Sequence, residues 1–298
     1  MNDAFPTGIA FDEALAILRA TAAGRRPAPE RLALARCHGR VLADAVVAPM
    51  PLPPFDNSAM DGFALRQADL AGQGDGLRLA GEQYAGPCAG LRVGPGECVR
   101  ITTGAPLPAG ADSVAVREVA RVEDGRVRLP ADLVPGANVR RAGEDVAAGD
   151  RVLAPGQLLT PARVALAAAL GIDQLAVAPR PTVAVFTTGD ELVPPGMPLQ
   201  PGQIHDSNRE LLLGLLRADG LEPTAWPVLP DQPARVEAML RDAAASFDLV
   251  LTCGAVSAGE KDHIPALLQA RGRVRFWKVR MKPGMPVLFG ELGRAAFL

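Results

Sequence analysis

Four predicted strands in the C-terminal part of the chain are each accompanied by residues that could bind an anion or a cation. Glycine lets the backbone approach an anion closely, and N–H groups at the start of a helix bind it. Carboxylates hold Mg²⁺ through oxygen, and lysine supplies charge to a phosphate. The set predicts a site for a phosphate-bearing ligand and a hard cation. Its members are Gly189, Asp190 and Glu191 after the first strand, Asp231 after the second, Gly254, Ser257, Gly259 and Asp262 after the third, and Lys278, Lys282, Pro283 and Gly284 at the fourth.

Polar residues also interrupt the apolar stretch PLPPFDNSAMDGFAL at 51–65. Asp56 and Asp61 are five residues apart, so an extended chain points them to opposite faces. We therefore expect the two carboxylates to have different roles. Asp56 and Asn57 are expected to shape the loop through local hydrogen bonds.

Each of these residues has a purely structural alternative. Asp231 and Asp262 could simply cap helices, and Gly189-Asp190 could simply form a turn, without any part in a binding site. The chain contains no Gly-Lys pair and hence no Walker-type phosphate loop. Ser257 lacks the G-x-S-x-G pattern of a hydrolase nucleophile. The convergence of four loops therefore supports the site more than any single member does.

The composition restricts the class of protein. The 298 residues are 48% hydrophobic and 21% charged, which predicts two or three folded domains. The formal net charge of −2 gives no electrostatic reason to expect nucleic acid or a membrane as partner. The sequence shows no signal-peptide pattern and no CxxC pair, so we expect a reduced, cytoplasmic protein without a zinc site.

Residue patterns indicate the elements that position these residues. The 11–24 segment is predicted to be an amphipathic helix, which could pair with a second helix at 158–172. Between them, glycine, proline and short β-like runs indicate an inserted β-rich domain, with a hairpin turn at EDGR (123–126). From about residue 180, strands alternate with helices, which predicts a mostly parallel sheet. Ser207 with Glu210, and separately Asp231, are the expected caps of two of these helices.

Several motifs in order along the chain resemble those of the MoeA family of molybdopterin molybdenumtransferases, which includes the E domains of gephyrin and the plant Cnx proteins. The motifs are FDNSAMDGFA, RITTGAPLPAGAD, VRRAGED, FTTGDEL, HDSNRELL and WKVRMKPGMP. The resemblance implies insertion of molybdenum from molybdate into adenylylated molybdopterin, with Mg²⁺ as cofactor and AMP as product. It also implies a homodimer with composite active sites and transfer of molybdopterin from an adenylylating enzyme.

The same resemblance assigns site residues and domains. It implies a multidomain fold: a helical or mixed domain (1–47 and 147–178), an inserted β-rich domain (48–146) and a three-layer α/β domain that binds molybdopterin (179–298). The implied metal ligands are Glu191, Asp231 and Asp262. The implied catalytic residues are Asp61, Thr103, Asp145, Glu191, Asp231 and Asp262.

The chain departs from the family pattern in three places. Ala255 stands where the family usually has glycine, and Met285 stands where it often has lysine. The chain ends at Leu298, before the family's Gly-Leu-Pro-Gly-Asn-Pro loop, so we expect the fourth domain to be absent. The alternatives to the transferase are a non-catalytic scaffold that binds pterin or a partner, an inactive fragment of the enzyme, or a related adenylylating enzyme.

Overall fold

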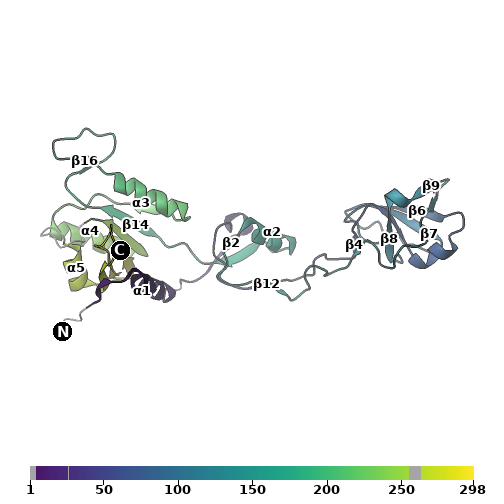
Figure 1. Cartoon of the computed structure of the whole chain (residues 1–298), viewed down its shortest axis with the longest axis horizontal. Coiled ribbons are helices and arrows are strands. Elements are labelled where there is room, and N and C mark those ends of the chain that lie inside the picture. The colour runs from purple at the N-terminus through teal and green to yellow at the C-terminus, as the bar shows by residue number, and fades with distance from the viewer. Residues whose placement is uncertain (1–4, 26, 255–262) are drawn as a thin grey trace. The chain divides into compact units, whose positions relative to one another are not determined.

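The computed structural model describes residues 5–25, 27–254 and 263–298 (Figure 1). Contacts between residues divide the chain into two compact units, which are described separately. The first unit contains the residues up to Glu30 together with Ala178–Leu298, and the second is Arg31–Val177. No helix in the described ranges is long and apolar enough to cross a membrane.

A seven-stranded sheet is the centre of the first unit. Parallel pairing joins β17, β14, β18 and β21 and also joins β1 to β19, whereas β20 runs antiparallel to both of its neighbours. The mostly parallel sheet predicted from the alternating pattern is therefore confirmed. In spatial order the strands are β1 (Thr7–Ile9), β19 (Arg273–Val279), β20 (Leu288–Leu292), β21 (Ala295–Phe297), β18 (Leu249–Cys253), β14 (Val183–Thr187) and β17 (Pro223–Ala225).

Helices cover both faces of this sheet, because its central strands are apolar on both sides. In β14, Ala184 and Phe186 pack in the cluster that contains residues of α4 (Pro233–Ser246) and α5 (Ile264–Arg271). The alternating residues Val183 and Val185 pack against α3 (Ser207–Ala218). The unit has the α/β architecture that the family resemblance implies, with helices on both faces of the sheet.

The N-terminal helix α1 (Phe11–Ala23) belongs to this sheet, which corrects the predicted pairing with the helix near 158–172. Its residue Ala14 packs with Phe276 of β19 and Phe289 of β20. Strand β1, just before it, extends the sheet by pairing with β19. The contacts therefore do not group α1 with the predicted helical domain of 1–47 and 147–178, because a distant strand supplies the apolar partner of α1.

A small mixed region of the second unit contains α2 (Pro161–Ala169) and two short ladders. Its core includes Leu42, Leu159 and Val177, and the hydroxyl of Thr160 caps α2. The ladders are β2 (Glu30–Ala33) with β13 (Gln174–Val177), and β3 (Val46–Val47) with β12 (Arg151–Leu153).

The β-rich region predicted between these ladders is a six-stranded sheet with apolar clusters on both faces. The EDGR turn is confirmed, since Asp124 and Gly125 adopt positive φ between two antiparallel strands. In spatial order the strands are β8 (Ser113–Val116), β5 (Gly62–Leu65), β7 (Glu97–Ile101), β6 (Leu77–Gln83), β10 (Arg126–Arg128) and β9 (Arg121–Glu123). A separate ladder joins β4 (Asn57–Ser58) to β11 (Val139–Arg140).

Two helix caps differ from the predicted ones. Asp206 caps α3 by accepting a hydrogen bond from the backbone N–H of Arg209, so Ser207 is the first helical residue. Helix α4 begins after Gln232, whose side chain makes no capping bond. Asp231 is thus not the cap of α4.

Candidate functional site

The carboxyl ends of three neighbouring strands, β17, β14 and β18, lie at one edge of the sheet in the first unit. The chain after β14 continues this pairing, with Thr188 bridged to Leu229. The order of the strands also makes β19 run in the same direction as β18, three strands further along. The carboxyl ends of the four strands therefore lie at one edge, with that of β19 about 14 Å from that of β18 by strand spacing.

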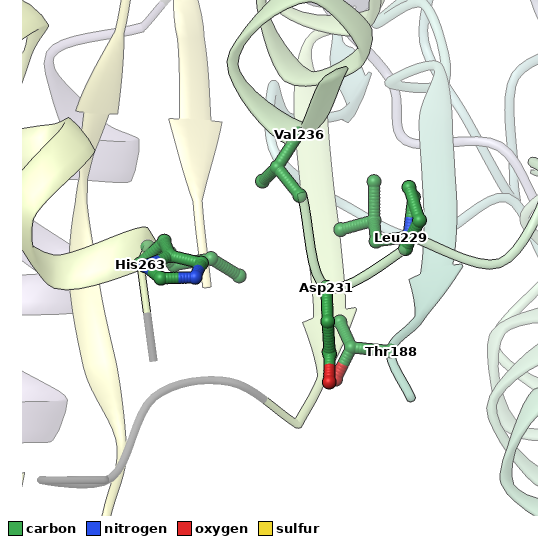
Figure 2. A pocket seen from close by; sticks show the side chains of 7 residues that line it. Thr188, Leu229, Asp231, Val236 and His263 are labelled. Carbon is green, nitrogen blue, oxygen red and sulfur yellow. The ribbon is translucent and has the colours of Figure 1, made fainter. Parts of the chain in front are cut away.

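A small pocket that is open to solvent lies at this edge. Figure 2 shows the oxygen-bearing ends of Thr188 and Asp231 pointing in the same direction, with His263 on the opposite side. The walls combine these polar groups with apolar side chains, an arrangement typical of small-molecule sites. The lining residues are Thr188, Leu229, Pro230, Asp231, Val236, His263 and Ile264.

Glycine is required at two positions beside the pocket. Gly189 and Gly254 have φ of 132° and 108°, which residues with a Cβ rarely adopt. A side chain at Gly189 would collide with the carboxylate of Glu191, and one at Gly254 would collide with the hydroxyl of Thr188. Close backbone approach therefore explains both glycines, and it places the Glu191 carboxylate against Gly189.

Backbone and side-chain contacts hold the loops together. The N–H and the hydroxyl of Thr188 both donate to the carbonyl of Cys253, at 3.1 and 3.3 Å. The backbone N–H of Asp231 donates to Oδ1 of Asp190 at 3.3 Å. Asp190 and Asp231, predicted from separate loops, are therefore brought together.

Lys278 has an unusual backbone. Its φ is 66°, a conformation that is unfavourable for a residue with a Cβ, and its Nζ lies 4.9 Å from the centre of the Trp277 ring. Strained residues of this kind are concentrated at functional sites. Lys282, Pro283 and Gly284 follow in the turn from β19 to β20, and Met285 beside them is 52% exposed.

Asp61 and Thr103 form a pair in the second unit, although 42 residues separate them. The backbone N–H and the hydroxyl of Thr103 donate to Oδ1 of Asp61 at 2.8 and 2.9 Å. These two bonds, with smaller contributions from Arg117 and Arg100, hold the pKa of Asp61 below its ordinary value. Asp61 is therefore an exposed, ionised carboxylate in a fixed orientation.

Asp56 and Asp145 have different surroundings from Asp61. Asp56 accepts hydrogen bonds from the backbone N–H of Ala142 at 2.8 Å and from Arg141 at 2.6 Å, which lower its pKa. Asp145 accepts from Arg140 at 2.6 Å on each of its oxygens. Asp56 thus connects the 51–65 stretch to the segment around residue 141, and Asp145 lies in that segment.

Some predicted residues fall outside the described ranges: Ser257, Gly259 and Asp262, together with the departure at Ala255. Within the described ranges, no group of three or more His, Cys, Asp or Glu side chains is arranged to hold a metal ion by itself. Sequence reasoning did not assign Thr188, Leu229 or His263 to the site. Their positions in the sequence could have indicated them: Thr188 directly follows β14, Leu229 lies two residues before Asp231, and His263 directly precedes α5.

Comparisons with known proteins identify the family of the chain. Residues 9–171 match the MoeA N-terminal region (domain I and II), and residues 184–297 match a family described as a probable molybdopterin binding domain. The sequence is 42% identical to the molybdopterin molybdenumtransferase of Haemophilus influenzae over 90% of this chain and 66% of that protein. It is also 42% identical to molybdopterin molybdenumtransferase 2 of Mycobacterium tuberculosis, over 89% of this chain and 68% of that protein.

A solved structure is similar as well. The molybdopterin biosynthesis MoeA protein from Pyrococcus horikoshii superposes with a TM-score of 0.77 and 30% identity, covering 97% of this chain and 73% of that one. The chain thus spans about two thirds of the length of the curated relatives it matches.

Proposed function

The chain belongs to the MoeA family, and we propose that it acts in molybdenum cofactor biosynthesis as a molybdopterin molybdenumtransferase. In this reaction molybdenum from molybdate enters adenylylated molybdopterin, the adenylyl bond is cleaved and AMP is released. The observation that carries the proposal is the pocket beside Thr188 and Asp231, at the carboxyl edge of parallel strands. Ligands of open α/β sheets bind at such an edge.

The chemistry of the donor groups fits a phosphate-bearing substrate. Lys278 and Lys282 carry positive charge at this edge, which suits a phosphate. The unfavourable backbone conformation of Lys278 also supports a functional role for this residue, because such strain is concentrated at functional sites.

Mg²⁺ is part of the proposal. Glu191 and Asp231, with Asp262 from outside the described residues, would hold it. Mg²⁺ usually takes one or two carboxylates and completes its shell with water and phosphate oxygens, so it does not need a larger acidic cluster. When bound, the ion would offset negative charge on the phosphates of the substrate.

We also propose the assembly that the family resemblance implies. Asp61, Thr103 and Asp145 would complete the site of a second copy of the chain in a two-fold homodimer, and an adenylylating enzyme would supply the molybdopterin. The four cysteines are free thiols, which supports the cytoplasmic location we propose.

AMP release is the decisive measurement. Adenylylated molybdopterin, molybdate and Mg²⁺ are mixed with this chain. In a second reaction they are mixed with a version to which the part of a relative's sequence that the chain does not match has been added. We expect the extended version to release about one AMP per site in a single turnover. Binding of adenylylated molybdopterin without AMP release by either version would contradict the transferase and favour the scaffold.

A further inference from the structure

A buried polar cluster lies directly beneath the loop that carries Glu191. Thr187, the last residue of β14, is 1% exposed, and Asp206, the residue before α3, is 3% exposed. The hydroxyl of Thr187 donates to Oδ2 of Asp206 at 2.6 Å. The guanidinium of Arg209 donates to the same hydroxyl at 3.1 Å, so Thr187 is satisfied as both donor and acceptor.

The carboxylate of Asp206 holds two elements at once. Its Oδ1 accepts the backbone N–H of Arg209 at 3.1 Å and thereby caps α3. Its Oδ2 accepts a hydrogen bond from Thr187 and lies 3.1 Å from Nε of Arg209. This second contact is an ion pair, and Nε makes no hydrogen bond there. The end of β14 and the start of α3 are therefore joined through one side chain.

The backbone around Asp206 extends this link to the site. Its N–H donates to the carbonyl of Val193 at 3.0 Å, and the N–H of Ile204 donates to the carbonyl of Glu191 at 2.9 Å. These bonds form the short parallel ladder of β15 (Leu192–Val193) and β16 (Ile204–His205). The segment that begins at Glu191 is thus attached to the segment that Asp206 fixes to β14.

We propose that Asp206, acting through Thr187, is a positioning residue that sets where Glu191 and Asp190 present their carboxylates. The inference rests on the proposed function for its catalytic consequence only. A cap alone would need just Oδ1 and would be served by an exposed polar residue. Burying a carboxylate is unfavourable unless it is paired and hydrogen-bonded, and such a network then favours a single arrangement of its surroundings.

Two substitutions at Thr187 separate positioning from packing. Thr187→Val keeps the shape and removes the hydroxyl, whereas Thr187→Ser keeps the hydroxyl and removes a methyl group. We expect Thr187→Val to lower kcat for AMP release about 10- to 100-fold, as for residues that orient catalytic ligands, with a smaller change in KM. Thr187→Ser should stay within about threefold of wild type, because its bond to Asp206 is retained. The reverse order would mean that Thr187 only fills space and would overturn the proposal.

Thr252→Val is the matched control. Thr252 lies in the neighbouring strand β18, opposite Phe186, and its hydroxyl donates to the carbonyl of Leu298 at 3.5 Å instead of to Asp206. We expect its kcat to equal that of wild type. If Thr187→Val does not fold, Asp206→Asn replaces it, since asparagine keeps the capping oxygen and loses the charge. Wild-type kcat for folded Asp206→Asn would likewise contradict the proposal.

Hydrogen exchange gives a readout that does not depend on activity. The amides of Ile204 and Asp206 donate to the carbonyls of Glu191 and Val193, so they report directly on the ladder. Thr187→Val should speed their exchange, measured by mass spectrometry on peptides covering 190–206, while Thr187→Ser and Thr252→Val should not. Unchanged exchange in Thr187→Val would overturn the positioning role. If the wild type releases no AMP, the proposed function fails, and the exchange comparison still decides the inference.

Discussion

Asp56 and Asp61 show how two carboxylates five residues apart acquire different surroundings. Asp61 receives both of its Thr103 bonds on one oxygen. Asp56 uses each of its oxygens to bind the segment around Arg141 and Ala142. The difference agrees with the expectation that they have different roles, although the partners of Asp56 are distant in sequence rather than local.

Asp61→Asn is expected to fold normally and to lose most AMP release. The amide oxygen can still accept both bonds from Thr103, but the charge is gone, and removing one charge-stabilising group typically lowers the rate about 10²–10³-fold. Single-turnover AMP release measures the effect, with circular dichroism as the check on folding. Asp56→Asn is the control and should have a milder effect, because it loses only an exposed ion pair. AMP release by Asp61→Asn at the wild-type rate would remove Asp61 from the catalytic residues.

Local sequence signals predicted where helices begin more reliably than they predicted which residue caps each helix. Asp231 and Ser207 both suit a helix N-terminus, yet the helices begin after Gln232 and Asp206. Capping preference alone does not choose among adjacent polar residues. The pairing of Asp61 with Thr103 depends on strands β5 and β7 lying side by side, so only the family resemblance could indicate it.

At the scale of elements, the predictions succeeded where the pattern is local. The strands β14 and β18, of which β14 is buried along its length, and the turn at Asp124-Gly125 follow from apolar runs and turn chemistry. The partner of α1 could not be predicted in this way. Periodicity shows that a helix has an apolar face, but the partner here is β19, more than 240 residues away along the chain.

Asp248 connects the starts of the two central strands. Its Oδ2 accepts the N–H and the hydroxyl of Thr182, both at 2.9 Å, and its own N–H donates to that hydroxyl at 3.0 Å. The backbone bond from Thr182 is the main cause that lowers the pKa of Asp248 from 3.8. A carboxyl whose pKa is lower in the folded state stabilises the fold above its unfolded pKa, and this contribution is lost as pH falls through the folded pKa.

We therefore expect Asp248→Asn to reduce the acid sensitivity of the fold. At pH 6 the variant should have a lower thermal midpoint than wild type, by an amount corresponding to about 1 kcal/mol or less for a solvent-exposed group. Between pH 6 and pH 3 the wild-type midpoint should fall further than that of the variant. Thr182→Val, which keeps the backbone donor, should give a smaller change. Parallel decreases in wild type and Asp248→Asn would show that this carboxylate does not contribute.

At the scale of the whole molecule, the candidate residues are divided between the two units. Glu191 and Asp231 belong to the unit built on the seven-stranded sheet, and Asp61 and Thr103 belong to the other. The order of motifs along the sequence predicted a multidomain α/β plus β protein, and the fold agrees. It could not predict that the N-terminal residues join the α/β unit, because that depends on the pairing of β1 with β19.

The proposed two-fold dimer predicts that two inactive variants restore each other. Each site would take Asp61 from one subunit and Glu191 from the other, and a two-fold axis repeats the same contacts twice. In the extended version, Asp61→Asn and Glu191→Gln would each be inactive alone. Random exchange of subunits gives about half heterodimers, each with one intact site and one doubly altered site. AMP release should therefore recover to about one quarter of wild type, because independent sites contribute in proportion to their number.

Fluorescence energy transfer between labelled subunits establishes that exchange has occurred. Absence of recovery after exchange would mean that Asp61 and Glu191 act within one chain, or that the chain does not form this dimer.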